Sequence, residues 1–245
     1  MNPLDFSGKT VLVVGGSSGI GNGIAQAFRR HGAEVHVWGT RPSAADYKAD
    51  DGCDLTGLRY SQVDVSDFAA IAANQPAFTS LDVLVLAQGA VLYKRAEFEM
   101  DGFQKVMDVN LNSLMACAGK FHDMLAASKG ALITISSTAA FHSTKGNPAY
   151  NASKAGAVGL TRTLGEAWAR EGIRVNGIAP GLVATKMTKV TTDNPERLQG
   201  AIAGIPMRRL GTPEDMAGVA LFLASPLSAY VLGQTIPVDG GLILA

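Results

Sequence analysis

The sequence predicts an α/β fold with a doubly wound, seven-stranded parallel sheet flanked by helices. Short runs rich in Val, Ile and Leu alternate along the chain with longer stretches of helical character. Most of these runs are apolar on both faces, which is typical of parallel strands covered by helices on each side. The chain shows no linker, low-complexity tract or internal repeat, so we expect residues 1–245 to form a single domain.

The expected elements follow in order along the chain. Strands are predicted at residues 10–14, 34–38, 58–63, 81–87, 131–136, 173–178 and 235–238. Helices are predicted near residues 20–31, 67–74, 97–127, 148–171 and 213–224. Right-handed crossovers between such strands place the helices on both faces of the sheet.

Two intervals do not fit the alternation. Residues 41–57 contain several Gly and Asp residues and are expected to form a loop. Residues 184–206 leave the carboxyl end of the sixth predicted strand without a clear helical pattern. Because ligands of open α/β sheets bind beyond the carboxyl ends of the strands, we interpret this segment as a substrate lid.

Composition excludes several classes of protein. Lys and Arg together number 21 and so do Asp and Glu, so the chain offers no electrostatic basis for binding nucleic acid. The two cysteines, Cys53 and Cys117, are far apart, which excludes a disulfide framework and a zinc ribbon. The histidines show no ligand spacing, and we expect no metal. Without a signal peptide or a long apolar span, we expect a soluble cytoplasmic protein with no membrane partner.

A glycine-rich turn follows the first predicted strand. Its residues are Gly15, Ser17, Ser18, Gly19, Ile20 and Gly21. Glycines let backbone N–H groups approach a phosphate, and the following helix favours an anion at its N-terminus, so the turn predicts dinucleotide binding. The same residues also match the nucleophile elbow of hydrolases. A serine hydrolase needs an acid and then a histidine later in the chain, and no histidine follows His142.

Tyr150 and Lys154 form the candidate catalytic pair. They are four residues apart in a predicted helix that begins near Asn147 and Pro148, so both side chains share one face near its N-terminus. An ordinary tyrosine has a pKa of about 10, and we expect Lys154 and an oxidised nicotinamide ring to lower that value. Tyr150 is then able to exchange a proton with an alcohol or carbonyl oxygen, to which Ser137, at the end of the fifth strand, also donates a hydrogen bond.

Taken together, these motifs resemble those of the short-chain dehydrogenase/reductase family over nearly the whole chain. The matching features, in order, are the glycine turn, Asp64-Val65, Asn110, Ser137 with Tyr150-x-x-x-Lys154, and Pro180-Gly181. The resemblance implies a Rossmann fold, a nicotinamide cofactor, a small-molecule alcohol or carbonyl substrate and a homotetramer. It also implies that Lys154 holds the nicotinamide ribose and that Asn110 anchors a water molecule in a proton relay.

The resemblance extends to contacts with the cofactor. It implies that Ser17 and Ile20 meet the phosphates and ribose, Asp64 and Val65 the adenine, and Val183 and Thr185 the carboxamide. The predicted cofactor-binding residues are Gly15, Ser17, Ser18, Gly19, Ile20, Gly21, Thr40, Arg41, Asp64, Val65, Gln88, Gly89, Tyr150, Lys154, Pro180, Gly181, Val183 and Thr185.

The chain departs from the family pattern at two places. Val14 stands where the family has a threonine, and Leu86-Ala87-Gln88-Gly89 replaces Asn-Asn-Ala-Gly. In the family, the hydroxyl of that threonine bonds to the backbone near the fourth strand. Because both sides of this polar contact are altered together, we expect an apolar contact in its place. Gln88 is expected to project toward the cofactor or the pocket.

The end of the second predicted strand bears on the choice of cofactor. Members that prefer NAD carry an acidic residue there, whereas this chain has Gly39, followed by Thr40 and Arg41. A guanidinium pairs well with a 2′-phosphate, so NADP(H) is favoured over NAD(H).

Several functions remain open within this interpretation. A 3-oxoacyl thioester reductase and an NAD-dependent polyol or sugar dehydrogenase are alternatives with the same chemistry. A non-catalytic dinucleotide-binding regulator is an alternative of another class, but it would not need both Tyr150 and Lys154.

Overall fold

The computed structural model describes residues 2–48 and 52–244 and contains one parallel sheet. Its strands are β1 (Thr10–Val14), β2 (Glu34–Gly39), β3 (Arg59–Gln62), β4 (Val83–Leu86), β5 (Ala131–Ile135), β6 (Arg174–Pro180) and β7 (Thr235–Val238). They lie in the order β3-β2-β1-β4-β5-β6-β7. The chain builds outward from β1 to β3 and then crosses back to β4, so the order reverses between β1 and β4. The predicted doubly wound, seven-stranded sheet is confirmed.

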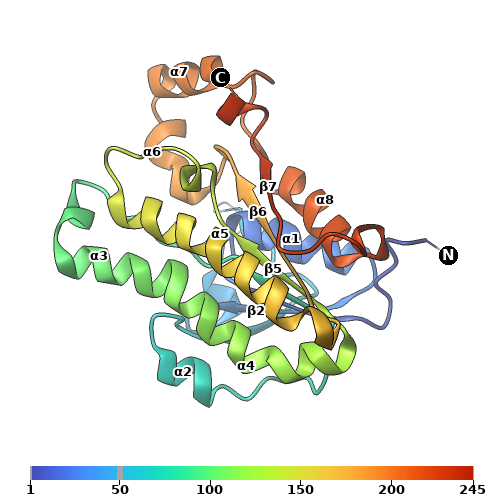
Figure 1. Ribbon diagram of the computed structural model, residues 1–245. Coiled ribbons are helices and arrows are strands. Elements are labelled where there is room, and N and C mark those ends of the chain that lie inside the picture. Colours follow the sequence, from blue (N-terminus) through green and yellow to red (C-terminus); the bar gives the residue numbers. More distant parts are fainter. Residues whose placement is uncertain (1, 49–51, 245) are drawn as a thin grey trace.

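Helices cover both faces of the sheet (Figure 1). They are α1 (Gly19–Arg30), α2 (Phe68–Ala73), α3 (Met100–Met107), α4 (Ser113–Ser128), α5 (Pro148–Trp168), α6 (Lys189–Thr192), α7 (Pro195–Gly204) and α8 (Pro213–Ala224). Helices α1 and α8 pack together on one face, where Phe28 and Leu223 are fully buried. Helices α2, α4 and α5 cover the other face, where Ile71, Phe121 and Leu164 join a second apolar cluster. Two cores, one on each face, hold the sheet in place.

The long helix expected at residues 97–127 is instead interrupted. A 3-10 turn (Ala96–Phe98) precedes α3, and a π-helical turn (Asp108–Asn112) separates α3 from α4. Such wide turns are frequent at functional sites, because they let one side chain leave the regular helical spacing. Here the turn contains Asn110, whose side chain is buried and hydrogen-bonded to neighbouring segments.

The interval at residues 184–206 contains more helix than its sequence pattern indicated. It holds a 3-10 turn at Lys186–Thr188 and then α6 and α7. Local side chains start α7: Asn194 Oδ1 accepts a hydrogen bond from Arg197 N at 3.0 Å, and Pro195 occupies the first turn. In Figure 1 this segment lies beyond the carboxyl ends of the strands.

The interval at residues 41–57 forms a loop, as expected, over the part that the structure describes. It carries one 3-10 turn, Ala44–Asp46, and its residues 49–51 lie outside the described ranges.

The expected apolar contact between the first and fourth strands is confirmed. Val14 of β1 and Leu86 of β4 are partners in the ladder, and both side chains are fully buried. They belong to the same apolar cluster, so packing supports this junction. Within residues 2–48 and 52–244, no helix combines the length and the apolar character needed to span a membrane.

Candidate active site

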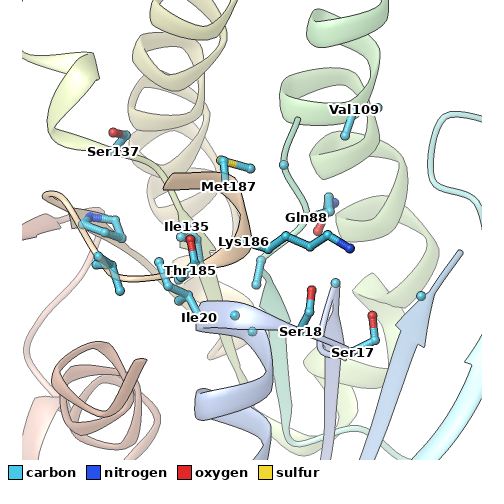
Figure 2. A pocket seen from close by; sticks show the side chains of 18 of the residues that line it. Ser17, Ser18, Ile20, Gln88, Val109, Ile135, Ser137, Thr185, Lys186 and Met187 are labelled. Atoms are coloured by element: carbon cyan, nitrogen blue, oxygen red, sulfur yellow. The ribbon is translucent and has the colours of Figure 1, made fainter. Parts of the chain in front are cut away.

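A cavity of about 330 Å³ lies at the carboxyl ends of the central strands, near the point where the strand order reverses. Figure 2 shows side chains from the glycine turn, the loop after β4, the end of β5 and the predicted lid, residues 184–206, around one space. The predicted residues that line it are Gly15, Ser17, Ser18, Gly19, Ile20, Gly21, Thr40, Val65, Gln88, Gly89, Ser137, Tyr150, Lys154, Pro180, Gly181, Val183 and Thr185. Segments from residue 15 to residue 188 therefore meet here.

One wall of the cavity is the glycine turn with the start of α1. Gly15 has a φ of +74°, and a Cβ atom at this position would lie 2.8 Å from the backbone nitrogen of Gln88. Ser18 is the N-cap residue of α1, and its side chain makes no capping bond to the described residues. The free N–H groups and the positive end of this helix therefore face the cavity, which suits a phosphate.

The opposite wall carries the candidate catalytic side chains. Ser137 follows β5, and its Oγ accepts a hydrogen bond from Ala139 N at 3.1 Å. Ser137 lies close enough to the Tyr150 hydroxyl to influence its ionisation. Lys154 Nζ lies 5.7 Å from the centroid of the Tyr150 ring and donates a hydrogen bond to the carbonyl oxygen of Ile135 at 2.9 Å. The structure therefore brings the three side chains together at one side of the cavity.

Burial controls the ionisation of this group. It raises the pKa of Tyr150, while interaction with Ser137 lowers it and electrostatic interactions with Tyr93 and Glu97 raise it further. Without cofactor, the pKa of Tyr150 is therefore raised rather than lowered, because desolvation of the phenolate dominates. The lowering expected beside an oxidised nicotinamide ring stays a prediction. Burial also lowers the pKa of Lys154 to about 8. At neutral pH the tyrosine is protonated, the form that donates a proton.

Asn110 lies beside the cavity and does not line it. Its Oδ1 accepts a hydrogen bond from Ala90 N at 2.7 Å, and its Nδ2 donates to Ala90 O at 2.9 Å and to Ser153 Oγ at 3.1 Å. Asn110 thus ties the loop after β4 to helix α5. Its role in a proton relay stays a prediction.

Two predicted cofactor residues also lie outside the lining. The guanidinium of Arg41 stacks on the ring of Tyr47, 4.7 Å from its centroid. Asp64 accepts hydrogen bonds from the backbone N and the Oγ of Ser66, at 2.9 and 2.7 Å. Both residues adjoin lining residues in the chain: Arg41 follows Thr40, and Asp64 precedes Val65.

Sequence reasoning missed part of the lining. The additional residues are Trp38, Gly39, Val63, Ala87, Val109, Ile135, Ser136, Lys186, Met187 and Thr188. Many of them end or directly follow a strand, so their position in the chain was a usable signal. Figure 2 shows Lys186 extending from the lid across the space between Gln88 and the two serines of the glycine turn. In the described ranges, no group of three His, Cys, Asp or Glu side chains is arranged to hold a metal ion.

Comparisons with known proteins cover nearly the whole chain. The family model described as "Enoyl-(Acyl carrier protein) reductase" matches residues 14–243. The 3-oxoacyl-(acyl-carrier-protein) reductase FabG of Chlamydia muridarum is 38% identical, over 96% of this chain and 97% of that protein. The 2-dehydro-3-deoxy-D-gluconate 5-dehydrogenase of Bacillus subtilis is 37% identical, over 96% of this chain and 95% of that protein.

A solved structure gives the same result in three dimensions. The crystal structure of a putative 2-deoxy-D-gluconate 3-dehydrogenase from Agrobacterium tumefaciens with bound NADP has a TM-score of 0.87 to this chain. The two sequences are 34% identical, and the match covers 100% of both chains. The arrangement of the sheet and its helices is therefore shared along the full length.

Proposed function

Because this chain belongs to the short-chain dehydrogenase/reductase family, as its motifs indicated, we propose that it transfers a hydride between NADP(H) and the alcohol or carbonyl group of a small molecule. One observation carries the proposal. A single cavity has an open helix N-terminus on one wall and Ser137, Tyr150 and Lys154 on the other. The first wall suits the diphosphate of a dinucleotide, and the second suits proton exchange with an oxygen.

The residues around the cavity fit a nicotinamide dinucleotide. Gln88 is 5% exposed, and its Nε2 donates to Ser113 Oγ at 2.9 Å. Ser113 Oγ itself donates to Val109 O at 2.7 Å, so it acts as acceptor toward Gln88 and fixes the orientation of the amide. Among the described residues the Oε1 atom has no hydrogen-bond partner. A buried acceptor of this kind suits a donor group of a nucleotide, such as a ribose hydroxyl or an amine.

The preference for NADP(H) is supported by the space around Gly39. A Cβ atom there would lie 2.4 Å from Tyr47 Oη and 2.6 Å from Ser17 Oγ, so an acidic side chain does not fit without movement of its neighbours. The hydroxyl groups of Tyr47 and Ser17 lie beside Gly39, and the Arg41 guanidinium lies over the Tyr47 ring. These groups are suitable donors for the 2′-phosphate that distinguishes NADP from NAD.

The bound cofactor supplies or accepts the hydride. In the direction of reduction, the Tyr150 hydroxyl donates its proton to the oxygen of the substrate, and Ser137 holds the same oxygen by a hydrogen bond. Protonated Lys154 stabilises the negative charge that remains on the tyrosine oxygen. In the direction of oxidation, Tyr150 accepts the proton of the alcohol.

Calorimetric titration of the purified protein with NADPH and with NADH tests this proposal. We expect Arg41→Ala to weaken NADPH binding about tenfold, through loss of a charge-assisted hydrogen bond, and to leave NADH binding unchanged. Arg30→Ala removes the same charge from the far end of α1 and serves as the control. Equal affinity of the wild type for both cofactors would contradict the NADP(H) preference. If neither cofactor binds, the proposal that this protein is a nicotinamide-dependent oxidoreductase is contradicted.

Assembly and location are further parts of the proposal. A homotetramer is supported by the exposed small residues Ala152, Ala155 and Gly159 on α5, which allow close approach of another helix. Light scattering at micromolar concentration tests the tetramer, and a monomer would contradict it. Cytoplasmic location and the absence of nucleic-acid partners stay predictions.

A further inference from the structure

Glu97 is a fully buried carboxylate next to the catalytic wall. It lies in the 3-10 turn Ala96–Phe98, before α3, and does not line the cavity. Its Oε1 accepts hydrogen bonds from Leu92 N at 2.9 Å and from Asn147 Nδ2 at 3.0 Å. Its Oε2 accepts one from the backbone nitrogen of Tyr150 at 2.9 Å. Glu97 therefore holds the residue that exchanges the proton.

The hydrogen-bond pattern shows that both oxygens act as acceptors. The donors are two backbone amides and one side-chain amide, which are all neutral. The orientation of the Asn147 amide is fixed, because its Nδ2 also donates to the carbonyl oxygen of Leu92 at 2.9 Å. Both oxygens therefore present lone pairs to donors, an arrangement that suits a carboxylate. Three donors compensate for its removal from water.

Glu97 also completes the N-terminus of helix α5. Asn147 is the N-cap residue of α5, but its side chain makes no capping bond within the described part of the chain. The carboxylate of Glu97 fills that role from a different element and places a negative charge at the positive end of the helix. Glu97 thus stabilises the first turn, in which Tyr150 lies.

The same network reaches the lid. Leu92, which binds Glu97, is followed by Tyr93, whose hydroxyl donates a hydrogen bond to Met187 O at 2.8 Å. Met187 belongs to the 3-10 turn at the start of the lid and lines the cavity. The loop after β4 therefore connects Tyr150 and the lid through one buried carboxylate.

We propose that Glu97 is a positioning residue of the reaction: it fixes the backbone of Tyr150 against the loop after β4, and it places a negative charge at the N-terminus of α5. The inference rests on the proposed function. The groups that face Tyr150 are Ser137 after β5, Tyr93 in the loop after β4, Lys154 on α5 and Glu97 itself. Lys186 of the lid lines the same cavity. Of these groups, Glu97 combines a negative charge with a direct bond to the Tyr150 backbone.

Two substitutions separate position from charge. Glu97→Gln removes the charge and turns an amide donor toward one of the three donors. We expect kcat to fall about tenfold, the dissociation constant of NADPH to stay within twofold, and the pH profile of alcohol oxidation to move to lower pH. Glu97→Asp keeps the charge but is too short for all three bonds, so we expect a lower kcat with the pH profile of the wild type.

Glu99→Gln is the matched control, because Glu99 is two residues away and exposed. We expect it to change neither kcat nor the pH profile. A wild-type kcat and pH profile in Glu97→Gln would overturn the inference. If Glu97→Gln does not fold, the test uses Glu97→Asp instead. A wild-type kcat in Glu97→Asp would also overturn the inference.

A direct titration keeps this test apart from the proposed function. The ultraviolet phenolate absorbance of the wild type, minus that of Tyr150→Phe, reports the ionisation of Tyr150 without turnover. We expect its midpoint to fall in Glu97→Gln. A shift in this midpoint without any NADPH-dependent turnover would support the role of Glu97 and contradict the proposed function. An unmoved midpoint in an active enzyme would contradict the role of the charge.

Discussion

Helices α1 and α5 both begin at the cavity, but their first turns are completed in opposite ways. At α1 the N-cap side chain of Ser18 makes no capping bond to a described residue, and the first turn is Gly-Ile-Gly-Asn. At α5 the carboxylate of Glu97 binds the N–H of Tyr150 inside the first turn. One N-terminus is open to a ligand, and the protein's own anion occupies the other.

The difference shows how one physical property serves two purposes. The exposed N–H groups and dipole of a helix attract an anion wherever they face a cavity. We expect the open α1 terminus to attract the phosphates of a dinucleotide. The α5 terminus already binds the carboxylate of Glu97, which holds the first turn that contains Tyr150. Binding and chemistry are thereby assigned to two helices that lie on opposite faces of the sheet.

The largest effect should follow from Tyr150→Phe at the α5 side. Removing the hydroxyl removes the proton donor, and we expect kcat to fall about a thousandfold with NADPH affinity within threefold of the wild type. Steady-state kinetics and calorimetry measure the two quantities. Tyr230→Phe, at a fully exposed position, is the control. Retained turnover in Tyr150→Phe would refute the assignment of chemistry to α5.

Ser18→Asp makes the α1 terminus resemble that of α5. The new carboxylate is able to cap the helix and repels the phosphates, so we expect NADPH to bind about tenfold more weakly and kcat at saturation to change little. Ser18→Asn, a neutral side chain of the same size, is the control. Unchanged NADPH affinity in Ser18→Asp would show that the phosphates lie elsewhere.

Helix α8 shows a third kind of N-terminus, which is capped by two of its own residues, Thr212 and Asp215. Thr212 N donates to Asp215 Oδ2 at 2.8 Å, and Asp215 N donates to Thr212 Oγ1 at 3.3 Å. An ion pair with Arg209, at 2.6 Å, lowers the pKa of Asp215 to about 2. We expect Asp215→Asn to lower the free energy of unfolding by about 1 kcal/mol at neutral pH, with no effect on NADPH binding.

The stability contributed by Asp215 depends on pH. Because the folded-state pKa of Asp215 is depressed, its contribution is present above the ordinary value of 3.8 and is lost as the pH falls toward about 2. Denaturant unfolding of the wild type and of Asp215→Asn should therefore converge over that range. Glu214→Gln, one residue earlier, is the control, and a difference that is undiminished at pH 2 would contradict the explanation.

Strand periodicity and local signals predicted most of the fold. The predicted bounds of β1, β7 and α8 coincide with the observed ones, because apolar runs, Pro213 and Ser225 mark those ends in the sequence. The division of the helix expected at residues 97–127 was not predictable in this way. It depends on bonds from Asn110 to Ala90 and Ser153, which are distant in the chain.

The candidate site shows the same limit. Motifs located the residues of the cavity wall, such as Ser137 and Tyr150, because the chemistry requires them at fixed spacings. Glu97 was not found, since a lone glutamate in a helical stretch is ordinarily exposed and its three donors come from elsewhere in the fold. The direction of the Tyr150 pKa was also missed, because spacing indicates a neighbouring charge but not the burial that outweighs it.

The apolar junction between Val14 and Leu86 constrains how this sequence can evolve. A single change of Val14 to Thr would bury a hydroxyl opposite Leu86 without a partner, and a single change of Leu86 to Asn would bury an amide against Val14. Each intermediate is less stable than either the apolar pair or a matched polar pair. Exchange between the two kinds of junction therefore requires coupled substitutions, and the two positions are expected to vary together among the descendants of a common ancestor.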